Sequence, residues 1–232
     1  MSRPARSRSQ SDRPRPRRRY AGADRAGDRG RDRGDAQSPH GTAAARARRS
    51  SARASLRAVP LTCIVLAAGA SKRLGRPKQL VHFEGEPLVV RAARTAAAVA
   101  PVIVVIPPNA AIREVLRGFI TIENMGEGMA SSLRCGVAET TGEVLIVLCD
   151  QPQITSEHLR ALIDAHAPIA ATGYSGISGV PAFFSAKFRD ELLALRGDAG
   201  ARTIIDAHRN EVVTIPFEAA AFDVDTDAAI SL

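Results

Sequence analysis

The segment from Thr62 to Lys78, which reads TCIVLAAGASKRLGRPK, constrains the possible fold of this chain more than any other stretch. It starts as a continuous apolar run, the pattern of a strand that is covered on both faces in a parallel sheet. The run stops at Gly69, and hydroxyl and basic side chains follow within nine residues. Glycine lets a ligand come close to the backbone, and exposed N–H groups there suit an anion. The segment therefore predicts a buried strand followed by a phosphate-binding loop.

The predicted loop differs from the two best-known glycine-rich phosphate loops, since neither GxxxxGK[ST] nor GxGxxG can be matched to it. Ser71, Arg73 and Lys78 add side-chain donors, which makes a triphosphate the expected ligand. The alternative is an ordinary turn between a strand and a helix, with solvated basic residues.

Charge is divided unevenly along the chain. Residues 1–60 contain 17 arginines, no lysine and five aspartates, a formal charge of +12, which leaves −4 for residues 61–232 of the overall +8. The basic character therefore belongs to the first 60 residues and does not make nucleic acid the main partner of the remainder. Residues 1–58 are predicted to be a disordered arginine-rich tail, because they lack the branched apolar residues that a core requires. Residues 59–232 are predicted to form one domain.

Three interpretations of the tail compete: an arm that contacts a polyanion such as RNA, a targeting segment, and a coding start placed too far upstream. A secretory signal needs an apolar segment, which the tail lacks, and transit peptides contain few acidic residues, whereas the tail has five aspartates. Targeting is therefore the least favoured. The start-site interpretation and the solvated or RNA-contacting arm stay open.

No apolar run approaches the roughly 20 residues that a membrane-spanning helix requires, so we expect no membrane association. The three cysteines, Cys63, Cys135 and Cys149, are widely spaced, and two of them lie in apolar runs. This pattern favours reduced thiols and differs from a disulfide framework or a zinc site. A cytoplasmic location is the expectation that follows.

From Leu61 onward, short β-rich runs alternate with segments of helical periodicity. This order predicts an α/β fold with three layers (α/β/α) and a doubly wound, mostly parallel sheet. The predicted strands are 63–66, 102–106, 119–122, 144–148, 169–172, 182–184, 212–215 and 222–224. The predicted helices are 87–99, 109–117, a segment ending near 137, 157–166, 186–195 and 199–208, and the glycine-rich segment 173–179 is predicted as a connection.

Ligands of such sheets bind beyond the carboxyl ends of the strands, which makes acidic residues there informative. Asp150 directly follows the apolar run 145–149, where a carboxylate is well placed to hold a divalent ion such as Mg²⁺. A turn or capping aspartate is the alternative. A second acidic group, DVDTD at 223–227, is either the source of another metal ligand or a solvated terminal strand.

Together these motifs resemble the MobA-like nucleotidyltransferase superfamily. LAAGASKRLGRPK is similar to its N-terminal signature, and the LAAG form is most like the molybdenum cofactor cytidylyltransferase branch. GMASSL at 128–133 resembles the nucleotide-binding segment, and CDQP at 149–152 resembles the metal-binding aspartate motif. GVP at 179–181, GDAGAR at 197–202 and DVDT at 223–226 resemble three C-terminal landmarks. The resemblance covers essentially all of residues 61–232.

The resemblance implies a Rossmann-like nucleotidyltransferase that transfers a nucleoside monophosphate from a nucleoside triphosphate, with CTP favoured, and releases pyrophosphate. The implied acceptor is a phosphorylated small molecule such as the molybdopterin cofactor. The implied cofactor is Mg²⁺, and a molybdoenzyme or a chaperone is the implied protein partner. Nucleic acid would be contacted through the tail if at all.

The resemblance also implies a role for each matching residue. Arg73 would hold the outgoing phosphates, Lys78 would contact the α-phosphate, and Asp150 would bind the metal with Asp225 as second ligand. The residues implied to bind nucleotide are Leu66, Ala67, Ala68, Gly69, Ser71, Gly128, Ser131 and Ser132.

Two further functions stay open at this point. Transfer of GMP or another nucleoside monophosphate to a different phosphorylated acceptor would use the same motifs. A non-catalytic nucleotide-binding protein, whose arginine-rich tail contacts nucleic acid, would bind RNA or DNA in a salt-sensitive way. The intact set of Arg73, Lys78 and Asp150 favours the enzyme.

Overall fold

A computed structural model describes residues 51, 60–69, 71 and 74–224. The predicted tail, apart from Ser51, and the two assigned residues Arg73 and Asp225 lie outside these described residues. In the described part, no helix has the length and apolar character needed to span a bilayer.

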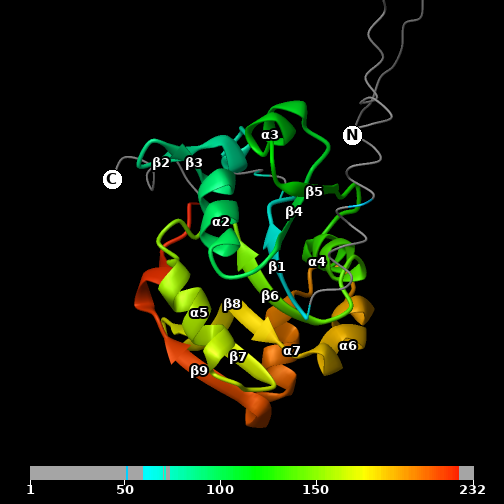
Figure 1. Cartoon of the computed structure of the whole chain (residues 1–232), viewed down its shortest axis with the longest axis vertical. Helices are drawn as coiled ribbons and strands as arrows, with labels where there is room; N and C mark the ends of the chain where they lie inside the picture. Colours follow the sequence, from blue (N-terminus) through cyan, green and yellow to red (C-terminus); the bar gives the residue numbers. More distant parts are fainter. Residues whose placement is uncertain (1–50, 52–59, 70, 72–73, 225–232) are drawn as a thin grey trace, which may run out of the picture. The chain divides into compact units, whose positions relative to one another are not determined.

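A seven-stranded sheet forms the centre of the described domain, with the order β5-β4-β1-β6-β8-β7-β9 (Figure 1). Only β8 runs antiparallel to its neighbours, while the other adjacent pairs are parallel. The strands are β1 (Leu61–Leu66), β4 (Val102–Ile106), β5 (Ile120–Glu123), β6 (Glu143–Leu148), β7 (Ile169–Tyr174), β8 (Ile177–Phe184) and β9 (Val212–Pro216). The chain builds outward from β1 to β5 and then returns to place β6 on the other side of β1. The strand order therefore reverses between β1 and β6.

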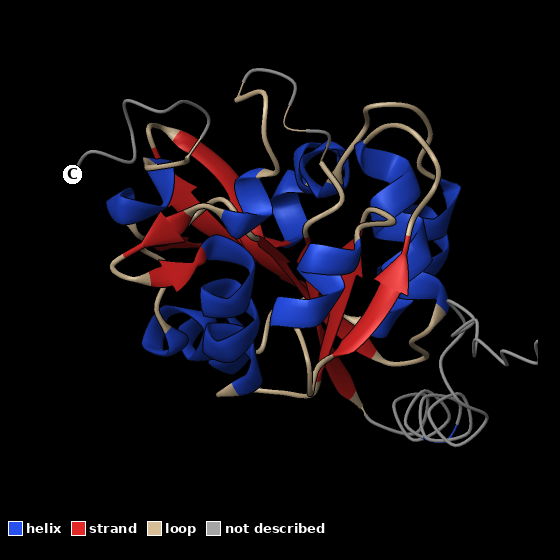
Figure 2. Cartoon of the chain, turned by 90° about the horizontal axis from the view of Figure 1, so that it is seen from above, coloured by secondary structure: helices blue, strands red, loops and turns tan. Residues whose placement is uncertain are grey.

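Helices cover both faces of this sheet, as Figure 2 shows. They are α2 (Leu88–Ala97), α3 (Ala110–Val115), α4 (Met129–Ala138), α5 (Ser156–Asp164), α6 (Arg189–Ala194) and α7 (Ala201–Ala207). Short 3₁₀ helices add Lys78–Leu80, Ala186–Phe188, Arg209–Glu211 and Glu218–Ala221. The predicted three-layer, doubly wound and mostly parallel α/β fold is confirmed.

Two apolar cores lie on opposite faces of the sheet, because successive strand side chains point to opposite sides. Ile64 and Leu66 of β1 face the layer of α4, α6 and α7. Cys63 and Val65 face the layer of α2, α3 and α5. Burial raises the pKa of the Cys63 thiol to about 12, so this cysteine stays protonated. All three cysteines are free thiols, as the sequence predicts.

Two elements differ from the predictions. The glycine-rich segment 173–179 is not a loop between strands, because it continues β7 and β8 into one hairpin with its turn at Ser175 and Gly176. Residues 222–224 do not form a strand. Phe222 packs its ring 6.0 Å from that of Phe83, in the hairpin that pairs β2 (His82–Phe83) with β3 (Glu86–Pro87).

Candidate active site

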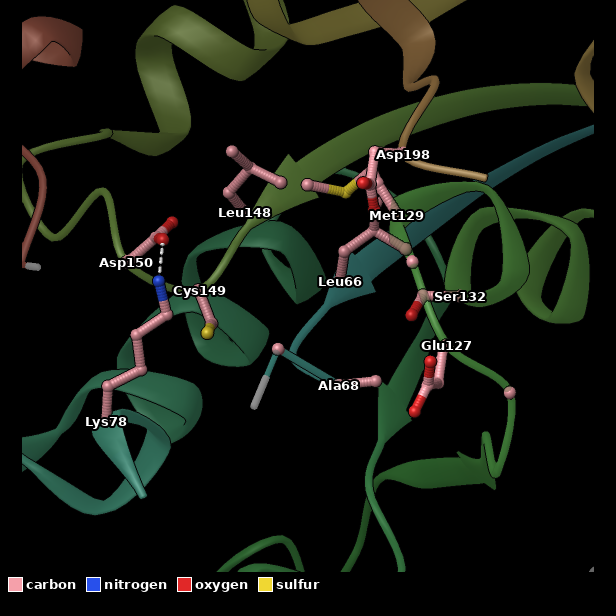
Figure 3. Close-up of a pocket in the computed structure, with 13 residues that line it drawn as sticks. Leu66, Ala68, Lys78, Glu127, Met129, Ser132, Leu148, Cys149, Asp150 and Asp198 are labelled. Atoms are coloured by element: carbon pink, nitrogen blue, oxygen red, sulfur yellow. Dashed lines mark hydrogen bonds and ion pairs between the residues drawn. The ribbon is translucent and has the colours of Figure 1, made fainter. Parts of the chain in front are cut away.

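A cavity of about 450 Å³ opens at the carboxyl ends of β1 and β6, where the strand order reverses. This is the place where doubly wound sheets bind their ligands, and the volume lies in the range of small-molecule sites. The lining residues are Leu66, Ala68, Gly69, Lys78, Gly126, Glu127, Gly128, Met129, Ser132, Leu148, Cys149, Asp150 and Asp198. Figure 3 shows how these side chains lie around the cavity.

Lys78 and Asp150 form an ion pair at one side of the cavity, between Lys78 Nζ and Asp150 Oδ2 (Figure 3). Their side chains are only 16% and 15% exposed, so water contributes little to the stabilisation of either charge. Asp150 directly follows β6, and Lys78 begins the first 3₁₀ helix. The sequence places these residues 72 positions apart, and the fold brings them together.

The neighbouring thiol of Cys149 is unreactive. Burial first, and then the charge of Asp150, raise its pKa well above the ordinary value. The thiol therefore stays protonated at neutral pH and is a poor nucleophile.

The loop after β1 is held by the buried side chain of Gln79. Its Nε2 donates to the carbonyl oxygen of Ala67 at 2.7 Å and to that of Gly69 at 2.9 Å. The backbone N–H of Ala67 is also bonded, to the carbonyl oxygen of Val105 at 2.8 Å. Ala67 is 1% exposed, is part of the core and does not line the cavity, whereas its neighbours Leu66, Ala68 and Gly69 do. The contact of Ala67 with nucleotide stays a prediction.

The start of α4 is organised by Asn124, a buried residue just after β5. Asn124 Oδ1 accepts hydrogen bonds from the Gly126 N–H at 3.0 Å and from Ser131 Oγ at 2.9 Å. Its Nδ2 donates to Ser132 Oγ at 3.0 Å. Ser132 lines the cavity, whereas Ser131 does not and is engaged by Asn124 instead.

Gly128 allows a close contact between α4 and the connection from α6 to α7. Its φ is +80°, and an added Cβ would lie 2.3 Å from the carbonyl oxygen of Gly197. That carbonyl accepts a hydrogen bond from the Ala130 N–H at 3.2 Å. This contact brings Asp198, which follows Gly197 in the chain, to the rim of the cavity.

Two other C-terminal landmarks reach the aspartate motif through hydrogen bonds. The Val224 N–H donates to the carbonyl oxygen of Asp150 at 2.9 Å, so the chain just before Asp225 lies beside Asp150. Gln151 Nε2 donates to the carbonyl oxygens of Val180 at 3.3 Å and Ala220 at 2.9 Å. Motifs that are far apart in the sequence therefore meet around residues 150 and 151.

Most of the described residues that the sequence singled out lie at the cavity: Leu66, Ala68, Gly69, Lys78, Gly128, Ser132 and Asp150. Ser71 does not line it, and its Oγ instead accepts a hydrogen bond from the Lys78 N–H at 3.0 Å, which closes the loop between them. Three further residues line the cavity: Met129 and Asp198, which lie within quoted motifs but had no role of their own, and Glu127, which lies outside those motifs. Glu127 lies between two glycines and Asp198 follows one, a pattern that indicates an acidic residue in a turn but not the cavity that it borders.

Asp150 also provides the chemistry that a divalent metal requires. Its Oδ1 is buried and has no hydrogen-bond partner among the residues that the structure describes. A buried carboxylate oxygen without a partner is costly, and a hard cation would satisfy it. Mg²⁺ commonly takes one or two carboxylates and completes its shell with water and phosphate oxygens. The residues present therefore fit a divalent ion shared with a phosphorylated ligand.

Comparisons with known proteins agree with this geometry. The family model of the MobA-like NTP transferase domain matches residues 63–212. Nicotine blue oxidoreductase from Paenarthrobacter nicotinovorans is 32% identical over 188 residues, which cover 72% of this chain and 92% of that protein. A probable molybdenum cofactor guanylyltransferase from Trichormus variabilis is 28% identical over 182 residues, which cover 72% of this chain and 86% of that protein.

A solved structure is also similar. The crystal structure of Rv0371c from Mycobacterium tuberculosis H37Rv has a TM-score of 0.64 and 29% identity, and the match covers 75% of this chain and 97% of that one. The complex of Rv0371c with manganese matches with a TM-score of 0.59 and 28% identity over 69% of this chain and 89% of that one.

The sheet and its cavity define a doubly wound α/β domain with the Rossmann-like architecture of nucleotidyltransferases. The chain belongs to the MobA-like NTP transferase domain family, as the sequence motifs predict.

Proposed function

We propose that this chain is a divalent-metal-dependent nucleotidyltransferase, which transfers a nucleoside monophosphate from an NTP to a phosphorylated small molecule and releases pyrophosphate. The observation that carries the proposal is the Lys78–Asp150 pair at the cavity, together with the buried Oδ1 of Asp150, which has no partner in the described part of the chain. An in-line transfer of this kind needs positioning and charge neutralisation more than covalent chemistry from the protein. A cation and a metal-binding carboxylate beside one cavity supply both.

Each residue has a distinct part in this proposal. Lys78 would donate to the α-phosphate, where negative charge develops during transfer. Asp150 would hold Mg²⁺, whose charge would neutralise part of the triphosphate, and the family resemblance adds Asp225 as second ligand and Arg73 on the outgoing phosphates. In the free protein Lys78 and Asp150 neutralise each other. Phosphate oxygens and a cation would replace these contacts on binding, so neither charge is left buried without a partner.

The donor that we favour is CTP, with GTP as the alternative. The support for CTP is the small Ala68 side chain at the cavity, in the LAAG form of the loop. The support for GTP is the relative from Trichormus variabilis, which is named as a probable guanylyltransferase. For the acceptor we propose the molybdopterin cofactor, with a molybdoenzyme or its chaperone as the protein that receives the product.

Thermal unfolding with nucleotides and metals tests the proposal before the acceptor is known. A ligand at 100 times its dissociation constant stabilises a protein by about 2.7 kcal/mol, which raises the Tm of a domain of this size by about 5 to 10 °C. We expect such a shift for CTP or GTP with Mg²⁺ or Mn²⁺. We also expect a smaller shift with Mn²⁺ alone, and its loss in Asp150→Asn. Asp164→Asn on α5, an exposed position away from the cavity, is the matched control and should respond like wild type.

Pyrophosphate release with molybdopterin then tests the transfer itself. Lys78→Met keeps the length of the side chain and removes its charge, and we expect it to lower the rate at least about hundredfold, as removal of one transition-state donor commonly does. Flat thermal shifts with all four NTPs would refute the proposal. They would favour a nucleic-acid-contacting protein, for which salt-sensitive RNA binding should be lost on deletion of residues 1–58.

An oxidoreductase is the second candidate, because the 32% identical relative carries that name. Electron transfer releases no pyrophosphate and does not require Lys78 beside an α-phosphate. Turnover of a redox dye by this chain, at the same rate in wild type and in Lys78→Met, would support an oxidoreductase over a transferase.

A further inference from the structure

Two carboxylates that have no partner among the described residues line the cavity that the Lys78–Asp150 pair borders. Glu127 and Asp198 both line it, and neither has a hydrogen bond or an ion pair with another residue that the structure describes. Figure 3 shows both on the side of the cavity away from Lys78 and Asp150. The cavity therefore has one side with a cation and a separate side with two carboxylates.

The backbone on both sides of this acidic rim is fixed. Asn124 holds Gly126 through the Gly126 N–H and through its carbonyl oxygen, which accepts from Asn124 Nδ2 at 3.1 Å. Glu127 is the next residue. Asp198 follows Gly197, whose carbonyl oxygen is bonded to the Ala130 N–H, and an added Cβ on Gly128 would lie 3.1 Å from Asp198 Oδ1. Both carboxylates are therefore presented from loops that α4 anchors.

This distribution of charge determines how a nucleoside triphosphate would enter. Its phosphates are strongly negative and would be repelled by Glu127 and Asp198, whereas Lys78 attracts them. The nucleoside is then the part that reaches the acidic rim. The groups on a nucleoside that a carboxylate recognises are hydrogen-bond donors, namely the ribose hydroxyls and the amino group of the base.

We propose that Glu127 and Asp198 determine the nucleoside specificity of the donor: Asp198 accepts hydrogen bonds from the ribose hydroxyls, and Glu127 accepts from the exocyclic amino group of the base. This inference rests on the proposed function and makes it more specific. Asp198 Oδ1 would lie 3.1 Å from an added Cβ on Gly128, the residue before α4, and Figure 3 draws Glu127 lower in the view than Asp198. With Asp198 and Glu127 in these positions, the ribose would lie nearer the first turn of α4, and the base would lie against the loop that precedes α4.

The proposal predicts which bases are rejected. Cytosine and guanine present an amino group, whereas uracil and hypoxanthine present a carbonyl oxygen or a hydrogen at the corresponding position. A carboxylate repels the carbonyl oxygen of uracil, so UTP should bind more weakly than CTP. It gains no hydrogen bond from the C–H of hypoxanthine, so ITP should bind more weakly than GTP. A missing hydrogen bond to a charged group commonly lowers affinity about tenfold or more.

Calorimetric titration of the full chain with Mg²⁺ and CTP, UTP or a deoxy analogue of CTP tests both residues, because without an acceptor the nucleotide is only bound. In Glu127→Gln the amide can donate to a uracil oxygen, so the preference for CTP over UTP should fall about tenfold. In Asp198→Ala the preference for CTP over 2′-deoxy-CTP or 3′-deoxy-CTP should fall by a similar factor. If GTP binds more tightly than CTP, GTP and ITP replace the pyrimidine pair.

Asp190→Asn on α6 is the matched control, because it removes one negative charge at a side chain that is 98% exposed and does not line the cavity. Its preferences for CTP over UTP and for CTP over the deoxy analogues should equal those of wild type. If Glu127→Gln and Asp198→Ala weaken every nucleotide by one common factor, the specificity roles are wrong, although the proposed function stands. If wild type binds no NTP, both the proposed function and this inference are wrong.

Discussion

Replacement of Gln79 by methionine tests whether one buried amide holds the loop after β1 in place. Gln79 is 1% exposed, and both hydrogens of its Nε2 are used, for the carbonyl oxygens of Ala67 and Gly69. Methionine has a similar length and fills the same space, but it cannot donate. Gln79→Met therefore removes two hydrogen bonds and leaves the packing largely unchanged.

The expected loss follows from the surroundings of the two acceptors. Ala67 is 1% exposed, so water cannot replace the lost donor, and an unsatisfied buried acceptor costs about 1 to 3 kcal/mol. Gly69 is exposed and its carbonyl can be hydrated, so it adds little. We expect Gln79→Met to lower the free energy of unfolding by about 2 kcal/mol. With a urea m-value of about 2 kcal/mol/M, the midpoint should fall by about 1 M.

Urea unfolding followed by circular dichroism measures this shift, and CTP titration measures its effect on the loop. Gln153→Met, an exposed position before α5, is the matched control and should leave the midpoint unchanged. Gln79→Glu should destabilise more than Gln79→Met, because a carboxylate would face two carbonyl oxygens. A midpoint in Gln79→Met equal to that of wild type would show that the two hydrogen bonds contribute nothing, and the reasoning would fail.

Three further predictions concern packing, nucleotide binding and pH. Gly136→Ala should lower the free energy of unfolding by about 1 to 2 kcal/mol in urea, because its Cβ would lie 2.5 Å from Ile64 Cγ2 in the core and overpacking outweighs the better helix propensity of alanine. Gly128→Ala should weaken CTP binding in calorimetry. The φ of Gly128 is +80°, and the new Cβ would displace Gly197 and with it the connection from α6 to α7 that carries Asp198. Burial lowers the pKa of His158 below 6.5, so the unfolded chain binds its proton more readily than the folded one. The stability that neutral His158 provides is therefore present above about pH 6.5 and is lost as the pH falls. The urea midpoint should decrease from about pH 7 to about pH 5, and less so in His158→Asn.

Much of the fold could be predicted because its central strands are buried on both faces. The runs at 63–66 and 102–106 consist of apolar residues, and the structure places β1 and β4 there. Asn109 and Thr155 cap α3 and α5 with their side-chain oxygens, as local sequence signals favour. These features depend on neighbouring residues, so a local pattern is enough to find them.

The elements that were missed depend on distant partners. The hairpin of β7 and β8 extends through glycines because β9 pairs with β7 and because Glu218 Oε2 accepts from the Ser175 N–H at 3.0 Å. The strand predicted at 222–224 is absent because the Val224 N–H bonds to Asp150 and not to a neighbouring strand. The turn at Glu84 and Gly85, both with positive φ, closes a hairpin of two-residue strands that is too short to give an apolar pattern.

The site residues also fall into two groups, those that a local pattern predicts and those that depend on distant contacts. Lys78 and Asp150 could be predicted because each follows a strong strand pattern at the edge where parallel strands bind ligands. The motif does not show whether Ala67 and Ser131 line the cavity, because this depends on two distant side chains. Gln79 donates to the carbonyl oxygen of Ala67, and Asn124 Oδ1 accepts from the hydroxyl of Ser131. Glu127 and Asp198 were missed because nothing in a glycine-flanked acidic residue shows which cavity it will border.

The C-terminal landmarks contact the site mainly through backbone groups. This explains why short motifs show that a chain belongs to this family but do not show which reaction it catalyses. The carbonyl of Gly197, the N–H of Val224 and the carbonyl of Val180 make the contacts that join these landmarks to α4 and to the aspartate motif. Backbone groups are the same in every residue, so these contacts place few demands on the side chains that face the cavity. Side chains at the rim can therefore change without disturbing these backbone contacts. A family whose named members include a guanylyltransferase and an oxidoreductase is what such an arrangement allows. Rim side chains such as Glu127 and Asp198 are therefore the residues in which we propose to seek the nucleoside specificity, in addition to the LAAG form of the loop.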